Sequence, residues 1–101
     1  MALYVAFMAP AFGASRETLV MGNARASEAV AAAGTGALAA EDGEVAVLCS
    51  DEALYVAHGS TPDASATTAT AATSARYYIP SGAQMAVKVA TGDKFAAAAV
   101  A

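Results

Sequence analysis

The stretch "ALYVA" occurs twice in the chain, at residues 2–6 and 53–57. In each copy every second residue is large and apolar, and the tyrosine falls on the opposite face, which is the period of a half-buried strand. The copies continue as Leu-x-Val-x-Phe and Leu-x-Val-x-His. Because the match ends directly afterwards, where 9–12 meets 60–63, we interpret the copies as two strands with one alternation, not as a duplicated unit.

Turn-forming residues divide the chain into segments of mostly about eight to twelve residues, a spacing typical of an all-β sandwich or barrel. The sequence therefore predicts one domain, residues 1–101, folded as a small antiparallel β-sandwich or β-barrel. The turn signals are Gly22-Asn23, Gly34-Thr35-Gly36, Asp42-Gly43, Asp51-Glu52, Pro80-Ser81-Gly82 and Gly92-Asp93.

A two-residue turn at Gly92-Asp93 would join residues 85–90 and 94–100 in a hairpin. One face of this hairpin is wholly apolar and the other carries Lys88, as a half-buried antiparallel pair requires. The cross-strand pairs of the apolar face are Val89 with Ala96, Val87 with Ala98, and Met85 with Val100.

The same reasoning predicts a hairpin with Asp51-Glu52 at its tip, extended backwards through Asp42-Gly43 so that Leu38 and Ala40 share its apolar face. A tight turn at Asp42-Gly43 would place Glu41 opposite Glu44, an unfavourable pair of like charges, so a wider loop is expected there. The predicted cross-strand pairs are Cys49 with Leu54, Val47 with Val56, and Val45 with His58. The predicted core contains Val47, Val56, Val87 and Val89.

Two segments are less regular. Residues 25–33 favour a strand, with the alternative of a helix capped by Ser27 and stopped by Gly34. Residues 59–75 are a low-complexity run of Ala, Thr and Ser without a large apolar residue. We therefore predict a long exposed loop at 59–75 that has no anchor in the core.

The composition points to a covered surface. Hydrophobic residues make up 57% of the chain and charged residues only 14%, against about 25% charged in an average soluble domain. Such a charge-poor surface suggests coverage by another subunit. The net charge of −4 and the scattered basic residues argue against nucleic acid. A single cysteine, Cys49, leaves no intrachain disulfide and no cysteine-rich zinc site.

The first fifteen residues carry no charge. A signal peptide is the alternative to a first strand, but the first basic residue is Arg16 and Pro10 interrupts the apolar run, so a strand is favoured. A membrane-spanning helix needs about 20 apolar residues, so no membrane partner is expected.

No constellation of catalytic residues stands out. In the predicted hairpin, Cys49 and His58 lie about 13 Å apart along the strand, too far for proton transfer. The acidic residues at 41–44 and 51–52 lack EF-hand spacing, and no GxSxG, HExxH or GxGxxG motif occurs. We therefore expect no enzymatic activity, no cofactor and no metal site.

The second half of the chain contains Val56-Ala57-His58-Gly59, then Pro62, a segment from Tyr77 to Gly82, and Gly92-Asp93-Lys94. Across residues 53–100 this order of strand and turn motifs resembles a group of small virion proteins of tailed bacteriophages. The resemblance implies a small β-domain on the outside of the phage head, a decoration or cement protein that stabilises the capsid. The implied partner is the major capsid protein, and the implied location is the capsid exterior of a virion assembled in the host cytoplasm.

A homo-oligomer is expected, with a trimer favoured, because three-fold positions are natural clamp points between capsomers. The alternative is a β-sandwich binding module for carbohydrate or a host surface, which the absence of Trp and the presence of only four Tyr disfavour. Candidate contact residues for the capsid or a neighbouring subunit come from the uncharged N-terminus and the 59–75 loop: Met1, Ala2, Leu3, Tyr4, Pro62, Thr67, Thr68 and Thr70.

Overall fold

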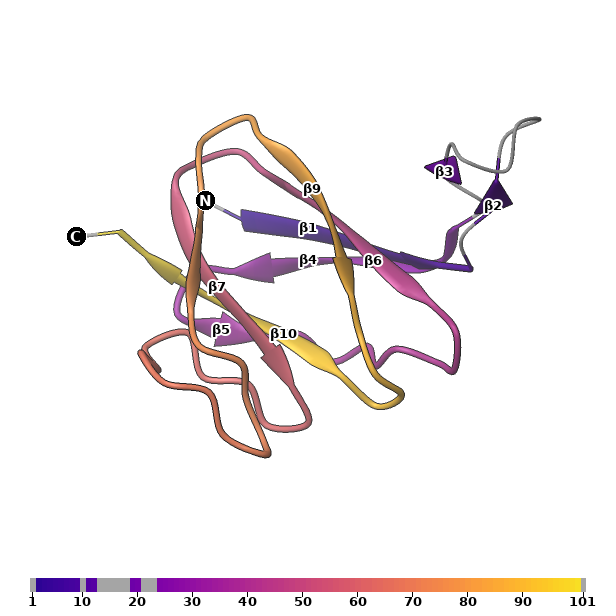
Figure 1. Ribbon diagram of the computed structural model, residues 1–101. Helices are drawn as coiled ribbons and strands as arrows, with labels where there is room; N and C mark the ends of the chain where they lie inside the picture. The colour runs from indigo at the N-terminus through magenta and orange to yellow at the C-terminus, as the bar shows by residue number, and fades with distance from the viewer. Residues whose placement is uncertain (1, 10, 13–18, 21–23, 101) are drawn as a thin grey trace.

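The computed structural model describes residues 2–9, 11–12, 19–20 and 24–100, with side chains at all of them except 11–12 and 19–20. Two four-stranded antiparallel sheets pack face to face as a small open β-sandwich, not a closed barrel (Figure 1). The sequence prediction of an all-β fold is confirmed, and the sandwich is the correct one of its two forms.

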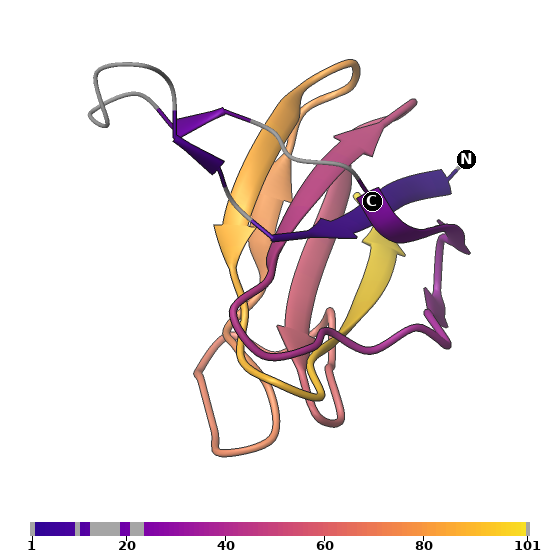
Figure 2. The same cartoon turned by 90° about the vertical axis from the view of Figure 1, so that its right-hand side faces the viewer.

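The first sheet has the strand order β4-β1-β6-β9 and the second sheet the order β5-β10-β7-β8. A two-stranded ribbon, β2 (Ala11–Phe12) with β3 (Leu19–Val20), extends beyond the end of β1 (Figures 1 and 2). The strands of the first sheet are β1 (Ala2–Met8), β4 (Ala24–Ala31), β6 (Val45–Ser50) and β9 (Gln84–Lys88). Those of the second are β5 (Gly34–Thr35), β7 (Leu54–Gly59), β8 (Tyr77–Ile79) and β10 (Lys94–Ala99).

The two "ALYVA" copies are interior strands of opposite sheets, β1 and β7. Their alternating apolar residues meet in one core, while Tyr4 points outward and is 49% exposed. The interpretation as two strands with the same alternation is therefore confirmed. The inward residues of the two strands are Leu3, Val5 and Phe7 of β1 with Leu54 and Val56 of β7, all fully or almost fully buried.

The two predicted hairpins are wrong. β6 pairs with β1 and β9, and β7 pairs with β10 and β8, so the turn at Asp51-Glu52 carries the chain from one sheet to the other. The Gly92-Asp93 turn likewise joins β9 in the first sheet to β10 in the second. Both connections are arches across the core. In an arch the apolar faces of the two strands meet through their side chains, so apolar matching alone does not distinguish an arch from a hairpin.

The arches change which residues are buried. On β6 the core side chains are Ala46 and Leu48, whereas Val47 is only half-buried on the outer side and Cys49 is exposed. Val47 as a core residue and the pairing of Cys49 with Leu54 are therefore corrected.

On β10 the core takes Phe95 and Ala97, not the predicted Ala96 and Ala98, and Val100 is exposed. The sequence prediction is correct for Val56 and Val89, which are buried, whereas Val87 is half-buried and packs against the core. Leu38 and Ala40 also pack into the core, but from a loop without strand structure.

The connection from β8 to β9, residues 80–83, also crosses between the sheets, and it lies beside the β6–β7 arch at the top of the sandwich in Figure 1. Backbone and side-chain hydrogen bonds join these two arches. There the backbone N–H of Gly82 donates to the carbonyl oxygen of Ser50 over 2.9 Å, and the hydroxyl of Ser81 donates to that of Asp51 over 3.1 Å. At the other end, Gly92 N–H donates to Ala40 O over 2.8 Å. These bonds satisfy turn groups that would otherwise have no partner within the fold.

The turn at Asp42-Gly43 is tight, contrary to the expected wider loop, and it brings Glu41 and Glu44 together. Arg25 resolves the repulsion: its Nε lies 2.7 Å from Glu44 Oε2, and its Nη1 lies 3.3 Å from Glu41 Oε2. The cation that permits this turn comes from β4, far away in sequence.

Residues 24–31 form a strand, so the strand interpretation of 25–33 is correct and the helix alternative is excluded. The segment 60–76 contains no strand, but it is anchored, contrary to expectation: Ala64 and Thr73 are buried. The backbone N–H of Ser74 donates to His58 O over 2.7 Å, which ties the end of the loop to β7.

Candidate contact surfaces

The outer face of the first sheet is broad and apolar. The strand register places Ala29, Tyr4, Cys49 and Gln84 in one row across the four strands. The rest of the face consists almost entirely of small or apolar side chains, and Lys88 at the corner is the one charged residue that the register of the described strands places there. The remaining members are Ala31, Ser27, Ala2, Ala6, Met8, Val45, Val47, Ala86 and Lys88.

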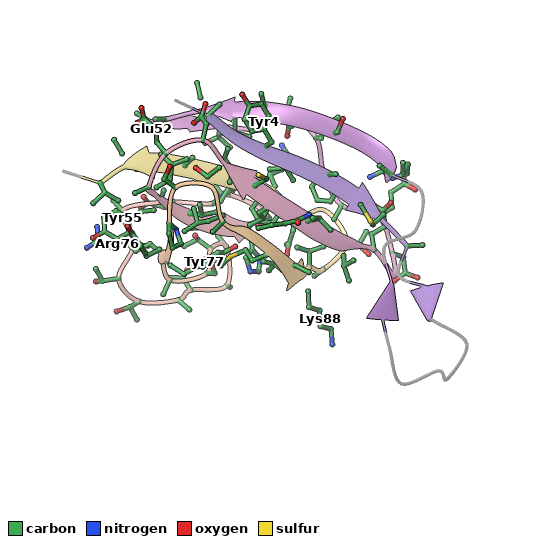
Figure 3. The ribbon with its side chains drawn as sticks, turned by 90° about the horizontal axis from the view of Figure 1, so that it is seen from above. Tyr4, Glu52, Tyr55, Arg76, Tyr77 and Lys88 are labelled. Carbon is green, nitrogen blue, oxygen red and sulfur yellow. The ribbon has the colours of Figure 1, made fainter. Side chains whose placement is uncertain are left out.

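This face is hollowed rather than flat. A groove of about 440 Å³ runs over it, and its lining includes Tyr4, Ala6, Val47 and Cys49 together with the charged Glu28 of β4. Tyr4 projects from this side of the sandwich (Figure 3). Four strands spaced about 4.8 Å apart and about six residues long give a face of roughly 400 Å², which lies within the size range of exposed apolar patches that are often functional.

The outer face of the second sheet is different, because the 60–76 loop covers part of it. Ala57 and Ala96 are opposite each other in the register and buried even though they point away from the core. A groove of about 210 Å³ remains between the loop and the 33–35 segment, with β10 as its floor. Next to it, the half-buried Tyr55 and the exposed Tyr78 form a pair of rings with centroids 6.2 Å apart.

The most reactive-looking side chains, His58 and Asp93, form a structural pair. His58 Nδ1 lies 3.2 Å from Asp93 Oδ2, and the Asp93 carboxylate also accepts the backbone N–H of Ala90 over 2.9 Å. The His58 ring is held between Phe95 and Tyr77, with centroid distances of 5.6 and 6.1 Å. This pair fastens the β9–β10 arch to β7.

Neither Ser74 nor Cys49 is placed to act as a nucleophile beside the His58–Asp93 pair. The hydroxyl oxygen of Ser74 accepts the backbone N–H of His58, and Cys49 lies on the outer face of the other sheet. Burial raises the pKa of the Tyr77 phenol above its ordinary value, so the group stays neutral. Among the described residues, no group of three or more His, Cys, Asp or Glu side chains is arranged to hold a metal ion.

The predicted contact residues fall into two separate places. Tyr4 and Ala2 lie on the outer face of the first sheet. Pro62 lines the groove over the second sheet, on the opposite side of the sandwich. The other loop residues of the set, Thr67, Thr68 and Thr70, are exposed.

Leu3 must be removed from the predicted contact set, because its side chain is fully buried in the core. Met1 lies outside the described residues. The uncharged N-terminus therefore contributes to a surface only through the outward side chains of β1.

Sequence reasoning did not include Ala6, Val47, Cys49 and Ala86 among the candidate contact residues, although the strand register places them on this face. Ala6 follows from the alternation of β1, two positions after Tyr4. Val47 and Cys49 were missed because the predicted hairpin put them on the core side of β6. The opposite assignment, in which Ala46 and Leu48 point into the core, fits the alternation of this strand equally well.

The chain matches no protein-family model, and no curated protein or solved structure shows a significant similarity to it. Within the described residues there is no apolar helix of membrane-spanning length.

Proposed function

We propose that this protein is a non-enzymatic structural component that binds the outside of an assembled bacteriophage capsid and stabilises it, with the outer face of the first sheet as its contact surface. The observation that supports this most is the composition of that face: among the described residues the strand register places one charged side chain on it, Lys88, and Glu28 lines its groove. The depletion of charge at the centre of an interface is the compositional mark of protein contacts.

The size of the face fits attachment at many points. A stable pairwise interface buries about 800 Å² on each partner, roughly twice the area of this face. One copy would therefore bind weakly, and stable attachment requires several copies held together. A homo-oligomer, with a trimer favoured, placed where several capsid subunits meet would gain the necessary avidity without a strong single contact.

Cys49 offers a direct test, because it is the only cysteine of the chain and its exposed thiol lies within this face. Purified virions should contain the protein in many copies by mass spectrometry. In those particles Cys49 should react with a maleimide at least about tenfold more slowly than in the free protein. Absence from purified particles would refute the proposal, and equal labelling rates would refute the assigned face.

A matched pair of variants tests the contribution to the capsid. Ala86→Glu places a charge on the exposed outer face of β9, and Ala69→Glu places the same charge on the exposed loop at the other side of the sandwich. We expect Ala86→Glu to abolish binding to capsids that lack the protein and to leave them rupturing at the lower temperature of bare particles. Ala69→Glu should bind and protect like the original protein; equal behaviour of the two variants would contradict the assignment.

A further inference from the structure

The outer face of the second sheet carries an aromatic and cationic cluster that capsid attachment does not use. Tyr55 and Tyr78 are cross-strand neighbours on β7 and β8. Their rings meet edge to face, and Tyr78 is 50% exposed. Tyrosine combines an apolar ring face with a polar hydroxyl, which suits a ligand that has both C–H faces and hydroxyl groups.

Arg76 completes the cluster. Its guanidinium carbon lies 4.0 Å from the centroid of the Tyr55 ring, so the cation is held against the ring (Figure 3). Arg76 is exposed and forms no ion pair with any described residue. A guanidinium fixed on an aromatic ring with its N–H groups unpaired by acids is arranged to bind a carboxylate through two parallel hydrogen bonds.

The cluster continues into the groove of about 210 Å³ beside the 60–76 loop. Ala98 lines that groove and lies directly opposite Tyr55 in the register, so Ala98, Tyr55 and Tyr78 form one row across three strands. The row is about 10 Å wide, two inter-strand spacings. A ligand on the tyrosines could therefore extend into the groove.

The groove itself favours a hydroxyl-rich occupant. Its lining contains alanine, glycine, threonine, serine and proline but no large apolar side chain, so a peptide side chain would find little to pack against. Asp63, another lining residue, accepts hydrogen bonds from the N–H and hydroxyl of Ser65 through Oδ1. These bonds lower the pKa of Asp63, and the ionised carboxylate is an acceptor for hydroxyl groups.

The walls of this surface are already in place. Ala72 O lies so close to Gly59 that a Cβ there would come within 2.1 Å of it, and the backbone N–H of Arg76 donates to the backbone carbonyl oxygen of Ala66 over 2.7 Å. A preformed surface loses little conformational freedom when a ligand binds.

We infer that Tyr55, Tyr78 and Arg76, together with the adjoining groove, form a binding site for an acidic glycan, with the sugar carboxylate on Arg76 and a neighbouring neutral sugar in the groove. The carboxylate of Asp63 disfavours a second acidic sugar in the groove. Arg76 is the single cation of this cluster, and the chain has a net charge of −4, so a polyanion is also excluded as the ligand. Because the site lies on the sheet opposite the proposed capsid contact, it is independent of that contact.

The test is an NMR titration of the isolated ¹⁵N-labelled protein with sialyllactose, with lactose as the neutral control. We expect saturable shifts at the amides of residues 55, 76, 78 and 98, and about tenfold weaker binding of lactose, because it lacks the charge-assisted contact. Arg76→Gln should weaken sialyllactose binding by about the same factor, and Tyr78→Ala should also weaken it. Lys88→Gln removes the same charge from the first sheet and should change nothing.

The inference would be overturned by the absence of a saturable shift, by equal binding to Arg76→Gln, or by shifts confined to another face. A hexaglutamate peptide that binds this site more tightly than sialyllactose would assign it to an acidic protein segment and would also refute a glycan site. The spectrum of each variant without ligand reports whether it is folded. Failure here leaves capsid attachment untouched, since that is measured on virions and through the opposite face.

Discussion

At the scale of single residues, the ion cluster around Arg25 shows how a long-range contact makes a local turn possible. Glu44 is almost buried, at 7% exposure, and Arg25 binds it with both Nε and Nη2 at 2.7 and 2.8 Å. The hydrogen bond from Arg25 holds the pKa of Glu44 below its ordinary value, and the same bond raises the pKa of Arg25. Both shifts mean that the charged pair is favoured in the folded state.

We expect Arg25→Gln to lower the melting temperature at pH 7, because Glu41 and Glu44 then repel each other without a cation between them. A lowered folded-state pKa gives stability that is present above the unfolded value of about 4.3. That stability is lost as the pH falls through the folded pKa. The difference in melting temperature between the variant and the original protein should therefore shrink between about pH 5 and pH 3.

Thermal denaturation at several pH values checks this. Asp51 and Asp63 also have lowered pKa values and make both proteins less stable in acid. The quantity to compare at each pH is therefore the difference in melting temperature between the variant and the original protein. Lys88→Gln, which changes the same charge on an exposed outer face, serves as the control. A difference that stays constant or grows in acid would contradict the assigned role.

Gly59 marks a second residue whose identity is set by a distant segment. An added Cβ would lie 2.1 Å from Ala72 O, and backbone atoms of the anchored loop cannot move aside as a flexible side chain can. We expect Gly59→Ala to lower the free energy of unfolding by about 2 kcal/mol, a typical cost of overpacking. It should also speed hydrogen exchange at the amide of Ser74, which donates to His58 O.

Gly82→Ala is the matched control, since no atom lies within 4 Å of the added Cβ there. Its φ of +76° costs about 1 kcal/mol for a residue other than glycine, but exchange at Ser74 should stay unchanged. Equal exchange rates in Gly59→Ala and the original protein would show that the loop does not depend on this close approach.

At the scale of elements, the sequence determined where most strands lie but not which strands pair. Alternation identified β1 and β7 and their inward residues, because Leu, Val and Phe stand against smaller or polar neighbours. On β10 four consecutive alanines leave Phe95 as the single marker of the inward face. On β6 both faces of the strand carry apolar residues, so the alternation does not say which face is inward. The partner of a strand depends on contacts across the whole core, which no local pattern encodes.

The same limit applies to the candidate contact surfaces. Tyr4 was predicted correctly as an outward residue because its strand alternates clearly. The row that extends from it through Cys49 to Gln84 exists only once β1, β6 and β9 are neighbours. The Arg76–Tyr55 contact likewise depends on the return of the loop to β7.

Truncation of single side chains tests which face of β6 points into the core. Leu48 is fully buried, so Leu48→Ala should lower the free energy of unfolding by about 3 kcal/mol through lost burial and a cavity. Val47 points to the outer face and is half-buried, so Val47→Ala should cost about 1 kcal/mol or less. Urea denaturation of both variants decides between the two registers, since the hairpin predicted from sequence requires the opposite order.

The anchored loop has a dispensable tip. Residues 67–69 are exposed, whereas Ala64 and Thr73 on either side of them are buried. We expect deletion of 67–69 to change the free energy of unfolding by less than about 1 kcal/mol, because loop length has a small entropic effect. Deletion of 72–74, which removes the hydrogen bonds to β7, should prevent stable folding, and a soluble folded product would show that the anchors are not needed.

At the scale of the whole molecule, the two outer faces of the sandwich have different characters. The first is open and nearly free of charge, whereas the second is partly covered by its own loop and carries an aromatic and cationic cluster. A two-sided domain of this kind can be held on one side while the other side is free for a second ligand. The proposed capsid contact and the inferred glycan site use this division.

The arches also have a consequence for the order in which the chain can fold. Along the chain, β5 to β6, β6 to β7, β8 to β9 and β9 to β10 all change sheet, so most strand pairs join residues far apart in sequence. Neither sheet is complete until residues 84–99 are available, because β9 closes the first and β10 joins β5 to β7 in the second.

Folding dominated by distant pairings is slow, typically milliseconds to seconds. We expect single-jump refolding from urea, followed by tyrosine fluorescence, to show a main phase in that range, and a microsecond phase would contradict it. During synthesis the apolar strand β6 lacks its neighbour β9, and β7 lacks its neighbour β10, until the last strands appear. A nascent chain of this protein therefore has a long interval in which it depends on chaperones, or on its neighbours, to avoid aggregation.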